Sequence, residues 1–462
     1  MRFQFTSVTD FILAPVLLVA ILLFTRFYVV SKVKDAPEYK YFFTGIALKL
    51  FGAFGLWFIY TFYYAGGDTF QYYESAVVTN DLIYKNPASF FSIWLGPHDI
   101  GKYALFRDVG TFPVYYRDPN TYFVVRVIIP LVFLSFRSYL VCAFYLATLS
   151  FFGIWKLYRV FINEYPDLKS KFAIAIFCIP SVFFWGSGIL KDTITFSMVS
   201  LFISAFYKIF IKKNNVFGNM IWLILASFVI VSIKPYIFIG LLPGSLFWII
   251  NRLLSSIKGK VLRFISAPLL FLLVGSFGYF LLSSLESTLG TYSLKKVLSR
   301  AAEVQHDLKS DYYKGNSFDI GEYDANISSM LLKAPAAINA ALFRPYIWQA
   351  NNIVMFLSSI ENFIILFFTI RVLIRSKIIL WIKYLPTNHL LTFSLIFSLF
   401  FAFSVGISSS NFGSMVRYKI PAIPFFVCSL YIIDYLRKKE LKQQKEAIAV
   451  KPLYDLKELS LT

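Results

Sequence analysis

Charged side chains interrupt this very apolar chain in five short motifs that could together form one site. A carboxylate such as Asp68 can take a proton from a hydroxyl group, and an arginine such as Arg417 can bind a phosphate through two parallel hydrogen bonds. If the motifs lie on one face of a membrane, they suggest an active site that opens outward. They are GGDTF at 66 to 70, GILKD at 188 to 192, IKPY at 233 to 236, FRPY at 343 to 346 and VRYK at 416 to 419.

Two acids and several further residues are the candidates for function. Asp68 is a candidate catalytic base because it begins a long outer loop. Glu361 is another because an acid inside an apolar helix is costly unless it is used. No residue is predicted to hold a metal ion. The candidate substrate-binding residues are Lys191, Asp192, Lys234, Arg344, Arg417 and Lys419.

These candidates also have structural interpretations, which the sequence leaves open. Asp68, with Gln71 three positions later, fits a capping box at the start of a helix, and Asp192 fits a helix cap as well. Lys191 and Lys234 can extend to lipid headgroups, and we prefer that interpretation for Lys49 near the inner end of its helix. Arg344 and Arg417 can likewise belong to an aromatic belt at the membrane interface. Glu361 can form a structural hydrogen bond between helices.

Long apolar segments must position these residues. Hydrophobic residues make up 58% of the 462 residues, with 53 Phe and 30 Tyr, which is too apolar for a water-soluble globule. A bilayer core about 30 Å thick requires about 20 apolar residues per helix. We therefore predict an all-α, polytopic integral membrane protein with about eleven transmembrane helices, at 11 to 30, 42 to 64, 138 to 157, 172 to 187, 193 to 211, 219 to 233, 236 to 251, 264 to 285, 352 to 373, 388 to 407 and 420 to 436.

The positions of Lys and Arg orient these helices, because short cytoplasmic loops carry an excess of both. The predicted transmembrane domain covers residues 1 to 436, with long outer loops at 65 to 120 and 286 to 351 that contain interfacial helices. A basic cytoplasmic tail follows at 437 to 462. The segment 121 to 135 is short and contains an arginine, so we place it at the outer interface. If that segment crosses the membrane, the orientation of every later helix changes.

The formal net charge of +20 does not indicate a nucleic-acid partner. Basic residues are concentrated in the predicted inner loops and in the tail, where anionic lipid headgroups explain them. The lipid bilayer is therefore the partner that the composition indicates.

Three segments resemble the GT-C superfamily of polyprenyl-phosphate-dependent glycosyltransferases. They are an acid in the first long outer loop (GGDTFQYYESA), a later outer turn with proline, aromatic and acidic residues (PSVFFWGSGILKD), and an arginine before a late helix (VRYKIPAIP). The last segment and the aromatic-rich helices also resemble bacterial oligosaccharide repeat-unit polymerases. Many superfamily members have an Asp-Asp or Asp-Glu pair in the first loop, whereas Asp68 stands alone. The resemblance therefore implies no required cofactor and leaves a divalent cation open.

What the resemblance implies is sugar transfer, in cell-surface polysaccharide assembly, from a polyprenyl-phosphate or diphosphate carrier to a glycan or lipid-linked acceptor. Asp68 would then deprotonate the acceptor hydroxyl, while the cationic candidates stabilise the departing phosphate. In the polymerase alternative, the same cations hold a diphosphate and either Asp68 or Glu361 is the base. The implied location is a bacterial-type cytoplasmic membrane, with a multi-pass chain whose site faces outward.

A transporter or flippase for lipid-linked sugars is the alternative from a different class. Helices interrupted by Pro180, by the Gly-Ser-Gly turn at 186 to 188 and by Pro235 are similar to the discontinuous helices of transporters. Transporters of that type usually consist of paired halves, and no internal repeat is visible in this sequence. A third alternative, a structural or assembly subunit, predicts that the outer charges can be removed singly without loss of activity.

Overall fold

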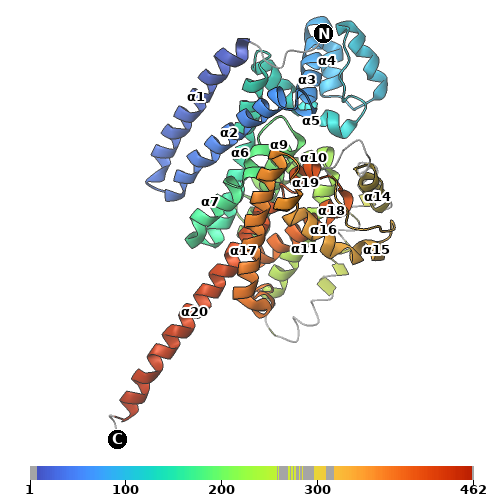
Figure 1. Ribbon diagram of the computed structural model, residues 1–462. Coiled ribbons are helices and arrows are strands. Elements are labelled where there is room, and N and C mark those ends of the chain that lie inside the picture. The colour runs from blue at the N-terminus through green and yellow to red at the C-terminus, as the bar shows by residue number, and fades with distance from the viewer. Residues whose placement is uncertain are drawn as a thin grey trace.

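The computed structural model consists almost entirely of helices (Figure 1). The structure describes residues 8–257, residue 259, isolated positions between 269 and 284, residues 296–308 and residues 317–459. Within these residues no strand forms, apart from an isolated antiparallel bridge between Ser317 and Asn411. The α-helices of this part of the chain are α1 (Val8–Val33), α2 (Lys40–Phe62), α3 (Asp68–Lys85), α4 (Pro87–Trp94), α5 (Pro119–Leu134), α6 (Tyr139–Glu164), α7 (Lys169–Phe177), α8 (Pro180–Trp185), α9 (Lys191–Phe206), α10 (Val216–Ile233), α11 (Pro235–Ser256), α14 (Val297–Leu308), α15 (Ile327–Leu332), α16 (Ala334–Phe343), α17 (Ile353–Tyr384), α18 (His389–Ser408), α19 (Phe412–Tyr418) and α20 (Ile423–Leu459).

The lengths and composition of these helices define a multi-pass helical membrane protein, as the sequence predicts. Among the described residues, 8 helices are long and apolar enough to cross a membrane. A ninth span forms if α19 and α20, which are bent by 63° relative to each other, are taken together. The 8 helices are α1, α2, α6, α9 with the π-helical turn Tyr207–Lys212 that follows it, α10, α11, α17 and α18.

The predicted count of about eleven crossings is not confirmed. The predicted crossing at 172 to 187 consists of two short helices, α7 and α8, with a break between them. Ile179, at that break, is extended at φ −70° and ψ 121°, because the residue before a proline avoids the helical conformation. The predicted crossing at 264 to 285 lies mostly outside the described residues.

The helices differ in how much of their surface the rest of the protein covers. In the most apolar stretch of α1 only 17% of the residues are buried, whereas in that of α9 and the turn after it 78% are buried. Phe11, Phe24 and Phe27 of α1 are 65%, 74% and 73% exposed. Because contiguous apolar surface of this size is unfavourable in water, α1 is expected to face lipid. The buried α9 instead lies at the centre of the helical bundle.

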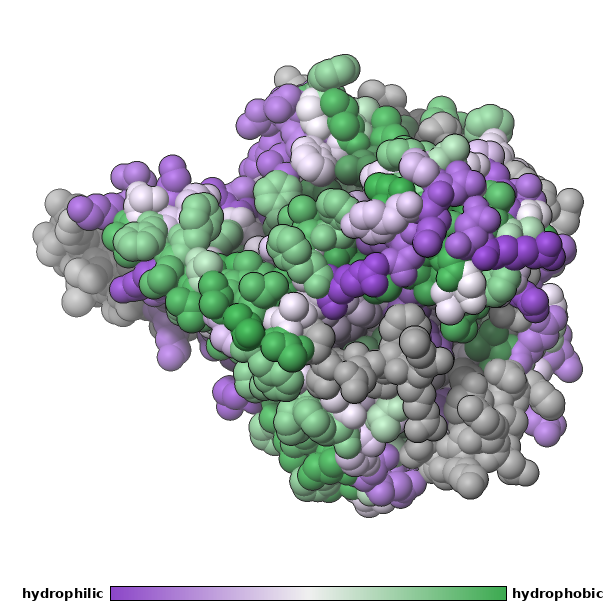
Figure 2. Space-filling view, turned by 90° about the horizontal axis from the view of Figure 1, so that it is seen from above, coloured by the Kyte–Doolittle hydropathy of each residue, from purple (hydrophilic) through white to green (hydrophobic). Residues whose placement is uncertain are grey.

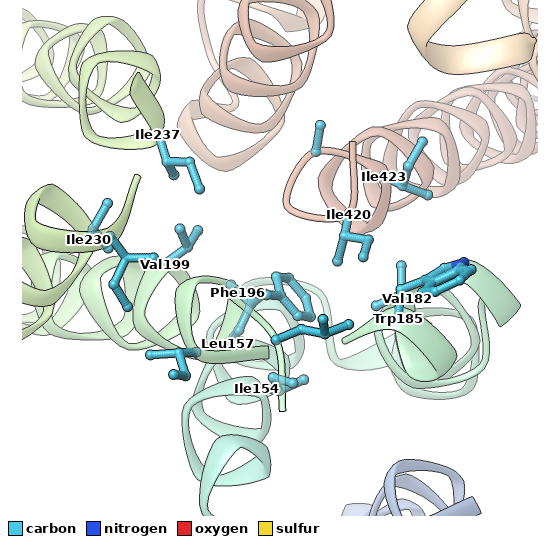
Figure 3. Close-up of a cluster of buried hydrophobic side chains, with 14 of the residues drawn as sticks. Ile154, Leu157, Val182, Trp185, Phe196, Val199, Ile230, Ile237, Ile420 and Ile423 are labelled. Atoms are coloured by element: carbon cyan, nitrogen blue, oxygen red, sulfur yellow. The ribbon is translucent and has the colours of Figure 1, made fainter. Parts of the chain in front are cut away.

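An apolar layer joins the central helices (Figure 3). Leu157 of α6, Phe196 of α9, Ile230 of α10 and Ile237 of α11 are fully buried and lie near one another, together with Ile420 just before α20. Interiors of this kind are close-packed, so small displacements of one helix are resisted by its neighbours. This layer holds α9, α10 and α11, whose ends carry charged motifs.

The two ends of the bundle carry different structures. Helices α3, α4 and α5 lie together at the end of the bundle where α1 begins, and α20 extends from the other end (Figure 1). Viewed from the first end, polar side chains form a band beside large apolar areas (Figure 2). The hydroxyl groups of Thr79 and Tyr122 form a 2.8 Å hydrogen bond that joins α3 to α5. The segment 121 to 135 is therefore packed as a short apolar helix against α3, and its interfacial position stays a prediction.

Candidate functional site

Four of the predicted site residues form one continuous ion-pair network, which we call the open network: Asp68, Asp192, Lys234 and Arg417. Arg417 Nη2 donates to Asp68 Oδ2 at 2.9 Å and to Asp192 Oδ2 at 3.4 Å. Lys234 Nζ donates to the other oxygen of Asp192, Oδ1. The hydroxyl group of Tyr60 adds a hydrogen bond of 3.3 Å to Asp68 Oδ1. Residues far apart in the sequence thus converge, as their motifs suggest.

Each member of the open network lies at an end of a helix. The glycine pair at 66 to 67 follows α2 with φ of 140° and 132°, a conformation that favours glycine, and Asp68 then begins α3. Asp192 lies in the first turn of α9, and Lys234 separates α10 from α11. Arg417 lies in the last turn of α19. The breaks between apolar helices therefore bring the four side chains together.

The capping interpretations of the two acids are wrong. The N-cap residue of α3 is Gly67 and that of α9 is Leu190, and neither helix has a side-chain cap. Both carboxylates pair with Arg417 instead, because opposite charges attract far more strongly in an apolar surrounding than in water. The alternative in which Lys234 extends to lipid headgroups is also wrong, since its buried Nζ lies over the ring of Tyr418 at 5.1 Å.

The open network is buried on one side and accessible on the other. The side chains of Asp192 and Lys234 are 1% and 7% exposed, whereas those of Arg417 and Asp68 are 18% and 31% exposed. The buried Nε of Arg417 has no partner among the described residues, and the exposed fraction of its side chain lies on the side of Asp68, with which it pairs. A ligand can therefore reach Asp68 and Arg417, while the buried pair holds Arg417 from behind.

Aromatic side chains surround Asp68 and Arg417, and of these Tyr115 is partly exposed while Tyr72 and Trp185 are buried. The rings of Tyr72 and Tyr115 lie 4.8 Å apart, and the Arg417 guanidinium lies 5.9 Å from the ring of Trp185. Burial raises the pKa of Tyr72 and of Tyr115, and the charge of Asp68 raises both pKa values further. Both phenols therefore stay neutral hydrogen-bond donors near that carboxylate. The sequence did not single out these residues, because aromatic runs at a membrane interface look alike.

Lys191 lies beside the open network but has partners of its own. Its Nζ donates to Thr121 Oγ1 at 2.6 Å, and the Thr121 hydroxyl in turn donates to Asp118. These contacts join the start of α9 to the start of α5. The sequence did not indicate these two residues, because Asp118 precedes and Thr121 begins the segment 121 to 135, whose notable features were its apolar character and its arginine.

Glu361 and Lys419 belong to a second cluster, which we call the closed network, together with Ser181 and Asn362. Glu361 Oε2 accepts from the Ser181 backbone N–H and Glu361 Oε1 accepts from its hydroxyl, both at 2.6 Å. Lys419 Nζ donates to Asn362 Oδ1 at 2.6 Å, and Asn362 Nδ2 donates to the Pro345 oxygen at 3.3 Å. The first N–H groups of a helix lack helical partners, so Glu361 stabilises the start of α8.

Arg344 is part of neither network. Its Nε donates to Gln349 Oε1 at 3.1 Å, and its Nη1 donates to the Asp319 oxygen at 3.5 Å. The guanidinium also lies 5.0 Å from the ring of Phe318 and 5.4 Å from that of Phe412. These contacts tie the chain after α16 to the start of α19. The structure thus brings together only part of the predicted set, and a substrate role for Arg344 stays a prediction.

The interpretation of Lys49 as a lysine that extends to headgroups is wrong. Its side chain is buried, and Nζ donates to the backbone oxygen of Gly186 at the end of α8. The last carbonyl groups of a helix lack helical partners, so Lys49 stabilises the end of α8 as Glu361 stabilises its start. Helix α8 carries Trp185, whose ring contacts Arg417 of the open network.

The fold and the open network together define a helical membrane protein with a charged, partly accessible site among its helix ends. In the part of the chain that the structure describes, no three His, Cys, Asp or Glu side chains come together as a metal site. Comparisons with protein-family models, with curated proteins and with solved structures found no match. The function therefore has to be argued from the chemistry of the site.

Proposed function

We propose that the protein is a membrane glycosyltransferase, which moves a sugar from a polyprenyl-phosphate or diphosphate carrier to an acceptor hydroxyl at the open network. One observation carries this proposal. An accessible carboxylate, Asp68, lies 2.9 Å from an arginine that is itself held by a buried acid and is partly exposed. A base beside a phosphate-binding group is the pairing that transfer from a sugar phosphate requires.

In the proposed reaction, Asp68 takes the proton of the acceptor hydroxyl as the hydroxyl oxygen attacks the anomeric carbon of the donor. The bond between that carbon and the phosphate oxygen breaks, and the electron pair leaves with the phosphate. Arg417 stabilises the charge that develops on the phosphate, with Lys191 close by. Asp192 and Lys234 are positioning residues, because they fix the guanidinium from the buried side.

The surroundings of the open network suit an amphipathic donor. A lipid-linked sugar has an anionic phosphate, a polar sugar ring and a long apolar chain. Tyr115 offers a partly exposed phenol near Asp68, and the buried rings of Tyr72 and Trp185 pack behind Tyr115 and Arg417. The many exposed apolar residues of the helical bundle provide a surface along which a polyprenyl chain can remain in the bilayer.

The proposal includes a setting in cell-surface polysaccharide assembly. The motif pattern favours a bacterial-type cytoplasmic membrane, with the open network facing outward. Repeat-unit polymerisation is a form of the same transfer, in which the donor is a diphosphate-linked oligosaccharide and the product is a longer chain. Product length therefore separates a single transfer from polymerisation, and movement of an unchanged donor between leaflets identifies a flippase.

The test uses the full chain, purified and reconstituted in lipid nanodiscs with a panel of undecaprenyl-phosphate-linked and diphosphate-linked sugars. The expected result is release of undecaprenyl phosphate or diphosphate together with a glycosylated acceptor. Asp68→Asn should lower this rate by about 10²- to 10⁴-fold, as expected for loss of a general base. Asp81→Asn is the matched control, because Asp81 is a partly exposed acid on the same helix that pairs with Arg137. Equal rates for both variants would contradict the proposal.

A further inference from the structure

A cavity lined by both charged and aromatic residues lies between α7, α17 and α20. Its volume is about 170 Å³, and its lining includes Lys171, Phe368, Arg371, Tyr431, Asp434 and Lys438. None of these residues belongs to the open or the closed network. Nor does the proposed sugar transfer use any of them.

The cavity carries more positive than negative charge. Asp434 is already satisfied, because it accepts from Arg437 at 2.9 Å and pairs with Lys438 at 2.7 Å. Among the described residues, Lys171 and Arg371 have no carboxylate partner. Two unmatched cations that share a cavity repel each other and therefore favour an anionic ligand between them.

Part of the cavity wall is aromatic. The rings of Phe368 and Tyr431 lie 4.9 Å apart, and Lys171 Nζ lies 5.7 Å from the Tyr431 ring. This cation–π contact orients the ammonium group of Lys171 without neutralising it. The ammonium group of Lys171 is therefore held beside the aromatic ring pair in the cavity wall.

The cavity lies away from the open network, towards the other end of the helices. Lys171 is in the first turn of α7, and the chain runs from there through α8 to Trp185 beside Arg417. Helix α20 likewise begins near Ile420 and runs past the cavity towards the C-terminus (Figure 1). On the predicted orientation, this is the cytoplasmic side of the membrane.

An apolar, exposed face of α17 adjoins the cavity. Phe363, Phe367 and Ile374 are 49%, 62% and 72% exposed and flank the cavity residues Phe368 and Arg371 on the same helix. A soluble anion gains nothing from such a face, whereas the acyl chains of a lipid can pack on it. The neighbouring surface therefore favours a lipid over a free phosphate as the source of the anion.

We propose that this cavity binds the phosphorylated headgroup of an anionic phospholipid in the leaflet opposite the open network. Lys171 and Arg371 contact the phosphate, the ring pair of Phe368 and Tyr431 supports the headgroup, and the acyl chains lie along α17. Basic pockets between transmembrane helices bind such headgroups on the cytoplasmic side. This site is independent of the proposed sugar transfer, since it shares no residue with the open network.

The experiment measures binding of phosphatidylglycerol to the delipidated full chain by native mass spectrometry, with phosphatidylcholine as the zwitterionic control. Each cation near an anionic headgroup is worth about 1 kcal/mol, so Lys171→Gln and Arg371→Gln should each weaken binding about fivefold and the double variant about 25-fold. Arg375→Gln is the matched control, because Arg375 is an exposed arginine one turn further along α17 that does not line the cavity. That variant should bind like the wild type.

Two further comparisons distinguish a lipid site from a site for a free anion. They also distinguish it from an effect of the overall positive charge of this face. Inorganic phosphate at millimolar concentration should fail to displace phosphatidylglycerol, and complete displacement would show a free-anion site instead. The two lipids should differ in affinity for the wild type, and equal affinities would overturn the proposal. The proposal also fails if Arg375→Gln weakens binding as much as Arg371→Gln does, because the effect would then come from the general charge of this face. Thermal unfolding of every variant without lipid checks that the fold is kept.

Discussion

The open and the closed network place similar side chains in similar apolar surroundings, yet they differ in accessibility. They meet on one short stretch, where Arg417 belongs to the open network and Lys419 to the closed one. The Asp68 side chain is 31% exposed, whereas Glu361 is 7% and Lys419 is 0% exposed. Both carboxylate oxygens of Glu361 accept close hydrogen bonds, while Asp68 Oδ1 has only the 3.3 Å contact with Tyr60.

This difference shows how charge in a membrane protein can serve structure or function. A buried charge is tolerated when every polar atom has a partner, since an unpaired group costs the full free energy of its desolvation. The closed network meets that condition and fixes α8 against α17. The open network instead keeps a partly exposed carboxylate, Asp68, and a partly exposed guanidinium, Arg417, which a substrate can contact. Charge type alone therefore does not separate a site from a structural cluster, but accessibility does.

The largest stability loss is expected when the buried half of the open network is broken. Lys234→Met leaves the fully buried Asp192 with only the longer contact to Arg417, and breaking a buried pair costs about 3–5 kcal/mol. We expect a strong drop in the thermal unfolding temperature in detergent micelles, followed by tryptophan fluorescence. The double variant Lys234→Met with Asp192→Asn should recover part of the loss. A single variant as stable as the wild type would show that the pair does not form.

An intermediate effect is expected in the closed network. Glu361→Gln keeps the shape of the side chain but weakens its hydrogen bonds to Ser181 and its attraction to Lys419. The expected loss of stability is about 1–3 kcal/mol, typical of hydrogen bonds to a charged group. Unfolding in increasing denaturant measures it, with Glu74→Gln on α3 as a control for a glutamate that is only half buried. If Glu361→Gln leaves stability unchanged, the closed network is not structural.

The smallest effect is expected for Arg344. Arg344→Gln removes the stacking of the guanidinium on Phe318 and Phe412, which is worth about 0.5–1 kcal/mol at a partly exposed position. Because Arg344 has no contact with the open network, sugar transfer should fall by less than about tenfold, the equivalent of 1.4 kcal/mol. Reconstituted transfer and unfolding temperature measure the two effects. A loss as large as that of Asp68→Asn would place Arg344 at the substrate.

The sequence predicted the class of fold well, because helix length and hydropathy are set by the thickness of the bilayer. It also predicted charges at the helix ends after α2, before α9, between α10 and α11 and before α20, and their common membrane side stays a prediction. It failed where a helix is broken within an apolar run. Pro180 and the glycines after Trp185 predicted a shortened helix, but not that α7 and α8 form separate helices, with α8 stabilised at its start by Glu361 and at its end by Lys49.

The partition of the charges into two networks could not be predicted from the sequence. Arg417 and Lys419 are two positions apart, so which of them meets Asp68 depends on the rotation of α19 and on the turn that follows it. Tyr72 and Tyr115 were missed for a related reason, since the chain has 30 Tyr residues and only tertiary packing shows which of them lie beside a carboxylate. Side-chain partners over long sequence separations are therefore what the structure adds.

The most direct test of the account compares two acids that the sequence treats alike. The transfer rates of Asp68→Asn and Glu361→Gln are measured in nanodiscs with the same lipid-linked donor, and each rate is divided by the folded fraction. We expect a loss of at least about 10²-fold for Asp68→Asn and a rate close to that of the wild type for Glu361→Gln. Loss of transfer in Glu361→Gln with full transfer in Asp68→Asn would contradict the assignment of the open network as the site.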